Sequence, residues 1–259
     1  MDFFNVPRGA LPAADPAKAF SSPGSALIAA WEQAGGDVKA LRRVYNPLPH
    51  WPSSTSGLTI GMGYDLDHQN DQLLKKEWGK VLSPDALAKL SDYTPSINAK
   101  GKQVPKKKNP SKAALVATKD VVIKYDDAVK VYEDKILPRY QAMANKAFPG
   151  FVSLDPYTQG ALLSMVYNRG DSYTLKKGTK QAKALRKKHF MEIREAVMKH
   201  DTKAIEAVLR AMKSEHNDPE TKKGLYRRRD AEADLIKDHQ TEIDKFYKTA
   251  PMWDPNFYI

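Results

Sequence analysis

The segment GLTIGMGYDLDHQ, residues 57–69, constrains the fold more than any other part of the chain. A short run of residues with β propensity is followed by two glycines at alternate positions, Gly61 and Gly63. Glycine tolerates the backbone angles of a tight turn, so this pattern predicts a strand that bends back on itself. The bend would let Thr59 and Asp65, six residues apart, face one cleft.

Acid–base chemistry at such a turn needs a second carboxyl group, and the candidate upstream is Glu32. Apolar residues recur at intervals of three and four from Ala26 to Ala34, which predicts a helix that ends at Gly35 and Gly36. Glu32 lies in the last turn of this helix, where the helix dipole disfavours a negative charge. Helix stability therefore does not explain this glutamate.

Composition limits the class of protein. A chain of 259 residues, 41% of them hydrophobic, is long enough for one large domain or two lobes with a sizeable core. Its apolar runs are far shorter than the roughly 20 residues that span a bilayer, and we expect no secretory signal at the N-terminus. The absence of cysteine excludes disulfides and thiolate metal sites. A net charge of +11 favours a polyanionic partner, such as nucleic acid, an anionic membrane or the bacterial cell wall.

The pattern along the chain predicts an irregular lead-in at residues 1–24, one domain at 25–250 and a tail at 251–259. Six lysines and no acid from Lys100 to Lys112 indicate a solvated loop, an insertion at about 99–112 between lobes. Helices are predicted over about 69–78, from Pro84 onward behind an N-capping Ser83, over 126–146 with an interruption at Pro138, through the apolar segment 158–168, and over 182–200, 202–214 and 225–247.

Three segments, in this order, resemble the phage-type lysozymes, glycoside hydrolase family 24 and its relatives, and most closely the pesticin-like branch. They are Glu32 with TIGMGYD at 59–65, TQGALLSMVYNRG at 158–170 and GLYRRRDAE at 224–232. The resemblance covers roughly residues 25–240. It implies an α+β, mostly α, two-lobed lysozyme-like fold, in which a small mixed N-terminal lobe and a larger helical C-terminal lobe clasp a glycan.

The position of the aspartate distinguishes two branches of this superfamily. The T-even phage enzyme has its catalytic aspartate between the glutamate and the threonine, an interval in which this chain has only Asp37. The order here is Glu32, Thr59, Asp65, as in the pesticin-like branch. The resemblance therefore implies that Asp65 is the catalytic aspartate, and Asp37 stays open as a stand-in.

The chemistry of glycoside cleavage agrees with these residue types. One carboxylic acid, Glu32, would protonate the leaving oxygen, and the carboxylate of Asp65 would activate water. The hydroxyl of Thr59 could hold that water, and carboxyl groups about 6.5–9.5 Å apart would give inversion. The resemblance also implies substrate-binding or supporting roles for three further residues, of which the arginine would pair with the catalytic glutamate: Tyr64, Asn168 and Arg228.

We therefore expect a muramidase, a hydrolase of the β-1,4 bond between N-acetylmuramic acid and N-acetylglucosamine in peptidoglycan. Two alternatives stay open. One is a non-catalytic module that binds glycan or nucleic acid, although no nucleic-acid motif is present and we expect no nucleic-acid partner. The other is a lytic transglycosylase, which needs the acid but not the water-holding aspartate. The six histidines show no metal-ligand spacing, so we expect neither a metal nor another cofactor.

The expected partner is bacterial peptidoglycan, met by a monomer that does not insert stably into a membrane. A phage endolysin released by a holin and a toxin injected by a secretion apparatus would carry the same catalytic domain. In both cases the protein would be made in the cytoplasm and act in the periplasm or cell wall. A toxin would also have an immunity protein as partner.

Overall fold

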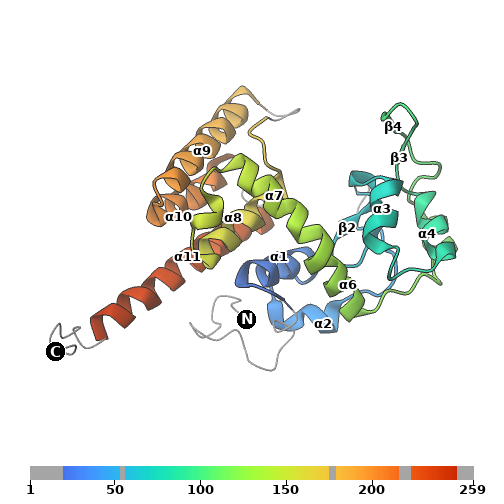
Figure 1. The fold of residues 1–259 in the computed structure, drawn as a ribbon, viewed down its shortest axis with the longest axis horizontal. Coiled ribbons are helices and arrows are strands. Elements are labelled where there is room, and N and C mark those ends of the chain that lie inside the picture. The colour runs from blue at the N-terminus through green and yellow to red at the C-terminus, as the bar shows by residue number, and fades with distance from the viewer. Residues whose placement is uncertain (1–19, 53–55, 175–178, 216–222, 250–259) are drawn as a thin grey trace, which may run out of the picture. The chain divides into compact units, whose positions relative to one another are not determined.

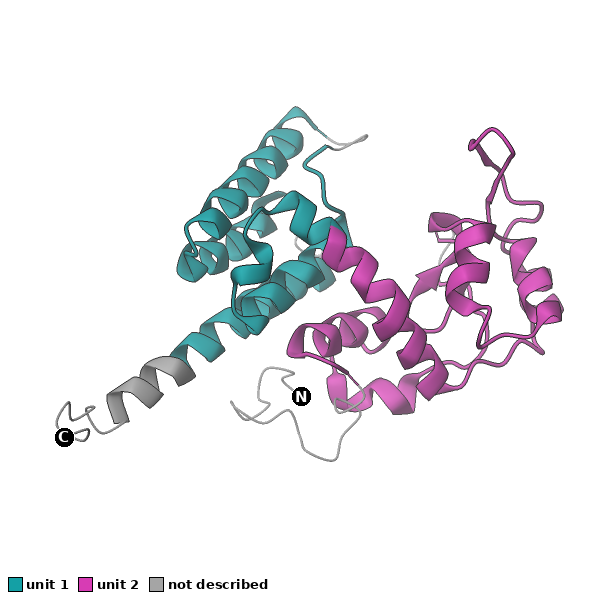
Figure 2. Cartoon of the chain, in the orientation of Figure 1, with its two compact units in different colours: residues 1–11, 143–259 teal, residues 12–142 magenta. Residues whose placement is uncertain are grey.

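The computed structural model describes residues 20–52, 56–174, 179–215 and 223–249. The chain forms two compact units, residues 12–142 (unit 2) and residues 143–259 with 1–11 (unit 1) (Figure 2). Helices dominate the described residues of both units, and unit 2 also contains two small antiparallel sheets (Figure 1). The predicted α+β, mostly α class is confirmed. The predicted tail and most of the predicted lead-in lie outside the described residues.

Unit 2 is built from short helices around a small sheet. Its helices are α1 (Pro23–Gln33), α2 (Leu41–Val44), α3 (Asp71–Trp78), α4 (Pro84–Ser91), α5 (Lys112–Ala117), α6 (Tyr125–Val131) and the first part of α7 (Leu137–Ala147). Short 3-10 turns lie at η3 (Val38–Ala40) and η4 (Leu66–His68). In α1 the residues from Gly24 to Ala30 are buried, so the helix that carries Glu32 is fixed by the core of this unit.

Side chains cap α3 and α4, and the cap of α4 is the one that the sequence predicts. The hydroxyl of Ser83 accepts a hydrogen bond from the backbone N–H of Ala86 at 3.2 Å, and Pro84 is the first residue of α4. Helix α3 begins two residues later than expected, because Asn70 caps it by accepting a hydrogen bond from Leu73 N–H at 2.9 Å.

The predicted bend is a β-hairpin. Strand β1 (Thr59–Ile60) pairs antiparallel with β2 (Tyr64–Asp65), and Thr59 lies opposite Asp65. The two glycines of the turn have φ of +54° at Gly61 and +76° at Gly63, angles that side chains disfavour. A β-carbon at Gly61 would also lie 2.4 Å from the ring of Trp78, so packing as well as backbone geometry requires glycine there.

The helix predicted at 126–146 is continuous, but its hydrogen-bond pattern changes before Pro138. A π-helical turn, η5 (Tyr132–Ile136), joins α6 to α7. Proline has no N–H to donate and its ring crowds the preceding turn, so a wider turn before Pro138 accommodates it without ending the helix. The expected interruption is therefore a local widening.

The sequence predicts a solvated loop for the lysine-rich segment, but part of this segment belongs to a β-hairpin. Strands β3 (Ser96–Ile97) and β4 (Gln103–Val104) form a second antiparallel hairpin, with Ile97 opposite Gln103. The hairpin extends from the region of α3 and α4 in Figure 1. Its strands are half-buried or exposed, so the hairpin contributes little to the core of unit 2.

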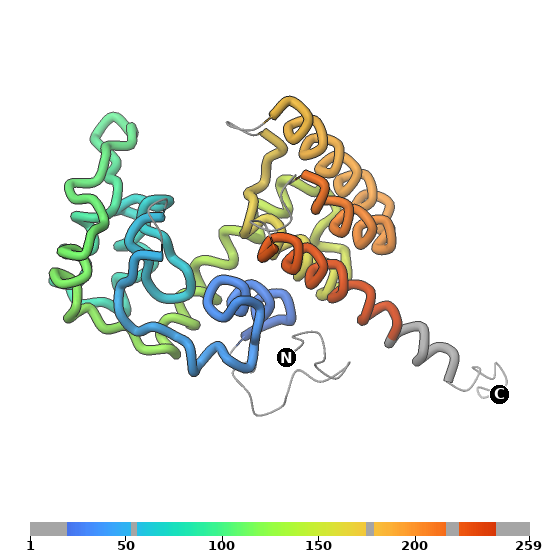
Figure 3. The backbone as a smooth tube through the Cα atoms, turned by 180° about the vertical axis from the view of Figure 1, so that it is seen from behind, coloured from blue at the N-terminus to red at the C-terminus, as the bar shows by residue number. Residues whose placement is uncertain are grey.

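Unit 1 is helical throughout its described residues. After the last part of α7 come η6 (Phe151–Ser153), α8 (Pro156–Arg169), α9 (Lys180–Met198), α10 (Thr202–Ala211), η7 (Met212–Glu215) and α11 (Lys223–Thr249). Helix α11 packs against α8 and α10, and α10 packs against α9 (Figure 3). Helix α8 is buried from Gly160 to Val166, as expected for the apolar segment. None of the helices in the described ranges has the length and apolar character needed to cross a bilayer.

Candidate active site

The first hairpin places two predicted catalytic residues on one face. The backbone N–H and C=O of Thr59 bond to His50, at 2.8 and 3.0 Å, and on the other side the N–H of Leu66 donates to the carbonyl of Leu58 at 3.0 Å. Thr59 and Asp65 therefore form a non-hydrogen-bonded pair, a class in which opposite Cα atoms lie about 4.5 Å apart and side chains approach closely. The two side chains therefore project from adjacent positions on one face of the hairpin.

Backbone groups fix the carboxylate of Asp65. Its Oδ1 accepts hydrogen bonds from the backbone N–H of Gly57 at 3.0 Å and of Asp67 at 2.9 Å. Its Oδ2 lies 3.1 Å from Nδ1 of the exposed His68. Burial acts to raise the pKa of Asp65, but the bonds from His68, Asp67 and Gly57 outweigh it and lower the pKa. The same contact raises the pKa of His68.

Gly57 is required by this arrangement. A β-carbon at Gly57 would lie 2.4 Å from Oδ1 of Asp65 and 2.6 Å from Cγ of Asp67. Both distances are shorter than any stable contact, so a side chain at Gly57 would displace the two carboxylates. The first residue of the sequence motif is thus a glycine because the aspartate approaches its backbone.

Glu32 lies against the turn of the same hairpin. A β-carbon at Gly63 would be 3.1 Å from Cβ and 3.4 Å from Oε2 of Glu32, which brings the end of α1 into contact with the turn. Glu32 is half-buried. Unit 2 therefore brings Glu32, Thr59 and Asp65 together around one hairpin.

The hydroxyl of Thr59 and the carboxylate of Asp37 already have backbone partners. Thr59 is 5% exposed, and its hydroxyl donates to the carbonyl of Gly57 at 3.3 Å. Asp37 is exposed and caps η3, with Oδ1 accepting from the N–H groups of Lys39 at 2.9 Å and Ala40 at 3.2 Å. A capping role accounts for the presence of Asp37.

Tyr64 belongs to the core beneath the hairpin. It is 1% exposed, and its ring packs edge-on against Trp78 with centroids 5.6 Å apart. Burial, followed by the charge of Glu77, raises the pKa of the Tyr64 phenol. Its position allows support of β2 and leaves almost no surface for a ligand.

Tyr140 on α7 is a polar neighbour of Glu32 that the sequence does not single out. Burial raises the pKa of its phenol. The charge of Arg139 acts to lower this pKa, and the nearby carboxylates of Glu32 and Glu77 act to raise it. Arg139 in turn donates to the side-chain oxygen of Gln69 at 2.7 Å. No periodicity of α7 distinguishes Tyr140 from an ordinary core tyrosine, so only the fold shows that its phenol is near the charge of Glu32.

Asn168 and Arg228, the other two predicted site residues, belong to unit 1. The guanidinium of Arg228 donates to the backbone carbonyl of Ser164 at 3.2 Å and to its hydroxyl at 3.3 Å. The side-chain oxygen of Asn168 accepts from Arg229 at 3.1 Å. Oε1 of the fully buried Glu232 accepts from Ser164 at 2.7 Å and from Arg229 at 2.9 Å. The motif GLYRRRDAE thus joins α11 to α8 by a buried polar network.

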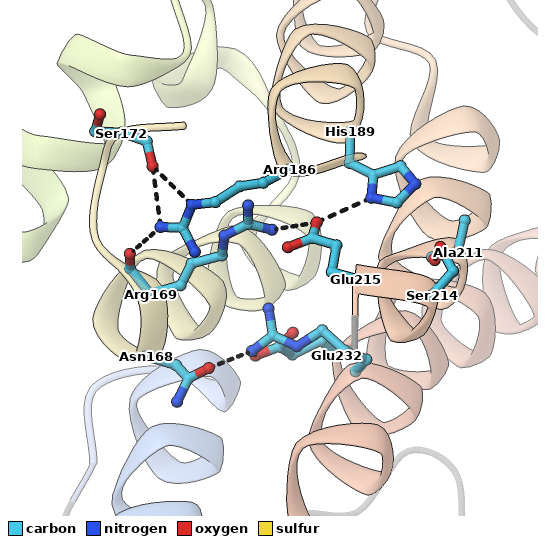
Figure 4. A network of polar contacts seen from close by, with 10 residues as sticks. Asn168, Arg169, Ser172, Arg186, His189, Ala211, Ser214, Glu215 and Glu232 are labelled. Atoms are coloured by element: carbon cyan, nitrogen blue, oxygen red, sulfur yellow. Dashed lines mark hydrogen bonds and ion pairs between the residues drawn. The ribbon is translucent and has the colours of Figure 1, made fainter. Parts of the chain in front are cut away.

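A second group of charges continues this network toward α9 (Figure 4). Oε1 of Glu215 accepts a hydrogen bond from the guanidinium of Arg169 at 3.0 Å and lies 2.9 Å from Nδ1 of His189. Arg186 donates to the carbonyl oxygens of Arg169 at 2.6 Å and Ser172 at 3.0 Å. Burial lowers the pKa of Arg169 to about 10, with the charge of Glu215 acting in the opposite direction. These contacts hold helices together and leave little of the charge exposed.

The gathered groups in unit 2 are those of acid–base chemistry. Two carboxyl groups and a hydroxyl lie around a turn whose backbone angles require glycine. Within the described ranges, no three or more histidine, aspartate or glutamate side chains gather as a metal site would require. The arrangement suits proton transfer to and from a substrate oxygen.

One comparison with known proteins finds a match. The family model described as a domain of unknown function, DUF8812, matches residues 28–229. This range includes the hairpin, Glu32 and the network of unit 1 up to Arg229. No curated protein and no solved structure matches the chain.

Proposed function

We propose that this chain, which belongs to the DUF8812 family of unknown function, is a muramidase that cleaves peptidoglycan. The bond cleaved would be the β-1,4 bond between N-acetylmuramic acid and N-acetylglucosamine. The observation that carries the proposal is the contact of Glu32 with the hairpin that pairs Thr59 with Asp65. The three residues come from two segments, and each has the side-chain chemistry that glycoside hydrolysis uses.

The roles follow from the environment of each group. Glu32 would donate a proton to the leaving glycosidic oxygen, which makes the sugar a better leaving group. Asp65, whose bonds to His68, Asp67 and Gly57 lower its pKa, would stay ionised and stabilise positive charge or activate water. Thr59 would turn its hydroxyl from the Gly57 carbonyl toward that water.

The lysozyme-like division into a small mixed lobe and a larger helical lobe is part of this proposal. The net charge of +11 supports a wall substrate, because peptidoglycan carries carboxylates and long-range attraction increases the rate of encounter. The protein would act as a monomer in the periplasm or cell wall. It would be an endolysin or an interbacterial toxin, in the second case with an immunity protein.

The test is digestion of purified peptidoglycan by the wild type and by the variants Glu32→Gln, Asp65→Asn and Asp37→Asn, with the products identified by mass spectrometry. We expect reducing N-acetylmuramic acid ends from the wild type and from Asp37→Asn. Loss of a general acid costs about 10²- to 10⁴-fold in rate, so Glu32→Gln should be almost inactive. An active Glu32→Gln protein of native fold would refute the assignment.

A lytic transglycosylase is the second candidate, and the hydrogen bonding of Asp65 favours it. Both carboxylate oxygens of Asp65 have partners, Gly57 and Asp67 on Oδ1 and His68 on Oδ2, which leaves less capacity to hold water. A transglycosylase needs no such water, since the 6-hydroxyl of the muramic acid attacks its own anomeric carbon. Anhydro ends in the same products, with Asp65→Asn still active, would establish this alternative.

A further inference from the structure

The hairpin formed by β3 and β4 is a structured basic arm, defined here as residues 96–108. The side-chain oxygen of Asn98 accepts from the backbone N–H groups of Lys100 and Lys102, both at 3.0 Å. Asn98 N–H also donates to the carbonyl of Lys102 at 3.0 Å, and Gly101 has φ of +71°. A turn held by these bonds keeps one conformation without help from an apolar core.

Three lysines anchor the basic arm to the rest of unit 2. The ammonium group of Lys106 contacts both carboxylate oxygens of Asp67, and its side chain is only 16% exposed. Lys107 and Lys108 both pair with Asp92, at 3.3 and 2.8 Å. Side-chain charge and one backbone bond, from the N–H of Lys108 to the carbonyl of Asp92 at 2.8 Å, therefore hold the base of the basic arm.

The anchor at Asp67 connects the basic arm to the candidate active site. Asp67 donates its backbone N–H to Oδ1 of Asp65, and its carboxylate is held by Lys106. The arm is therefore joined to Asp65 through one intervening residue. A polymer held by the arm would lie beside the hairpin that carries Thr59 and Asp65.

The tip of the basic arm presents charge that the protein does not use. Lys100 and Lys102 are exposed, and neither has a carboxylate partner in the described part of the chain. Val104 beside them is 37% exposed. A rigid turn with two uncompensated ammonium groups and a small apolar side chain has no evident role in stability.

We propose that the basic arm binds the carboxylates of peptidoglycan stem peptides, with Lys100 and Lys102 as the contacting residues and Lys106 as the joint to the active site. The inference rests on the proposed function, because it identifies the part of the wall polymer that lies outside the cleaved bond. Stem peptides carry several carboxylates and short methyl side chains, and these complement two ammonium groups beside an exposed valine.

The test measures binding separately from cleavage. The double variant Lys100→Ala/Lys102→Ala is made in the Glu32→Gln background and sedimented with insoluble peptidoglycan from which teichoic acids have been removed. The control, Lys180→Ala/Lys183→Ala on α9, removes two exposed lysines from unit 1 and changes the net charge equally. We expect the arm variant to bind about 3- to 10-fold more weakly and the control to bind as the parent does.

A second substrate identifies the ligand. Glycan strands from which an amidase has removed the stem peptides should bind the parent and the arm variant equally. An equal loss for the arm variant and the control, or the same loss on stripped glycan, would overturn the proposal. So would a loss seen only with wall teichoic acid or DNA as the probe.

The wild type and the arm variant with Glu32 intact are assayed on the same material for cleavage. Absence of cleavage by the wild type would refute the muramidase while the binding comparison is still measured. Cleavage by the wild type together with unchanged binding by the arm variant would refute only the arm.

Discussion

The polar groups of the two units are held in opposite ways. In unit 2, Asp65 receives backbone N–H groups from residues close in sequence and is half-buried. In unit 1, Glu232 is fully buried and receives side chains from α8 and its own helix. The first arrangement orients one carboxylate beside partly accessible groups, whereas the second ties two helices together.

This difference indicates where chemistry and where stability reside. A carboxylate held by backbone N–H groups on either side of the hairpin, here those of Gly57 and Asp67, keeps its orientation without a buried countercharge. This is useful for a group that must meet a substrate. A buried carboxylate between arginines is costly to disturb, because removing one partner leaves charge without compensation. Mutations in the two regions should therefore affect different measurements.

The largest expected effect is on stability, in unit 1. Glu232→Gln removes the countercharge of two buried arginines, Arg228 and Arg229, and should lower the free energy of unfolding by about 3–5 kcal/mol. Chemical denaturation would measure it. Glu195→Gln, which breaks an exposed pair with Lys199, should leave stability unchanged. Similar curves for the two variants would show that the buried network does not hold the helices.

The next effect should appear mainly in activity. Gly57→Ala places a β-carbon 2.4 Å from Oδ1 of Asp65, so it should move that carboxylate and abolish most of the cleavage of peptidoglycan. The accompanying loss of stability should be about 1–3 kcal/mol, as for overpacking elsewhere. Gly224→Ala is the control, because a β-carbon there meets nothing within 4 Å. Full activity of a folded Gly57→Ala protein would mean that the position of Asp65 does not matter.

How far the sequence predicts these two regions differs. The hairpin and the caps of α3 and α4 follow from local signals, glycine pairs and Ser or Asn before a helix, and these short-range rules survive in the fold. The contact of Glu32 with Gly63 joins residues far apart in the sequence, and no local signal predicts it. The need for a second carboxyl group and the resemblance to lysozymes named Glu32 as a candidate without giving this contact. Tyr140, near the same glutamate, carries no local signal at all.

The lysine-rich segment was predicted with less structure than it has. Its composition indicated a solvated loop, but composition does not report that Asn98 folds back on two N–H groups or that Lys106 pairs with Asp67. Both contacts depend on the neighbours that the fold supplies. Likewise, the composition of GLYRRRDAE does not report that Arg228 and Arg229 are buried.

A smaller effect should appear in the pH dependence of cleavage. The bond from His68 lowers the pKa of Asp65, so His68→Gln should raise that pKa and shift the acidic limb of activity to higher pH. The raised pKa of His68 means that its contribution to stability is present below its ordinary 6.5 and is lost as pH rises through the raised value. Unchanged acidic limbs would favour the transglycosylase, which does not need an ionised Asp65.

The smallest effect should come from the basic arm. Asn98→Ala removes two hydrogen bonds from an exposed turn. It should cost at most about 1 kcal/mol of stability, because no buried core depends on this turn. It leaves every lysine in place, so a weaker binding to peptidoglycan would come from loss of order at the tip and not from loss of charge. We expect a smaller decrease than for Lys100→Ala/Lys102→Ala, measured by the same sedimentation. Binding equal to the parent would show that the two ammonium groups act as mobile charges, and the arm would then need no defined turn.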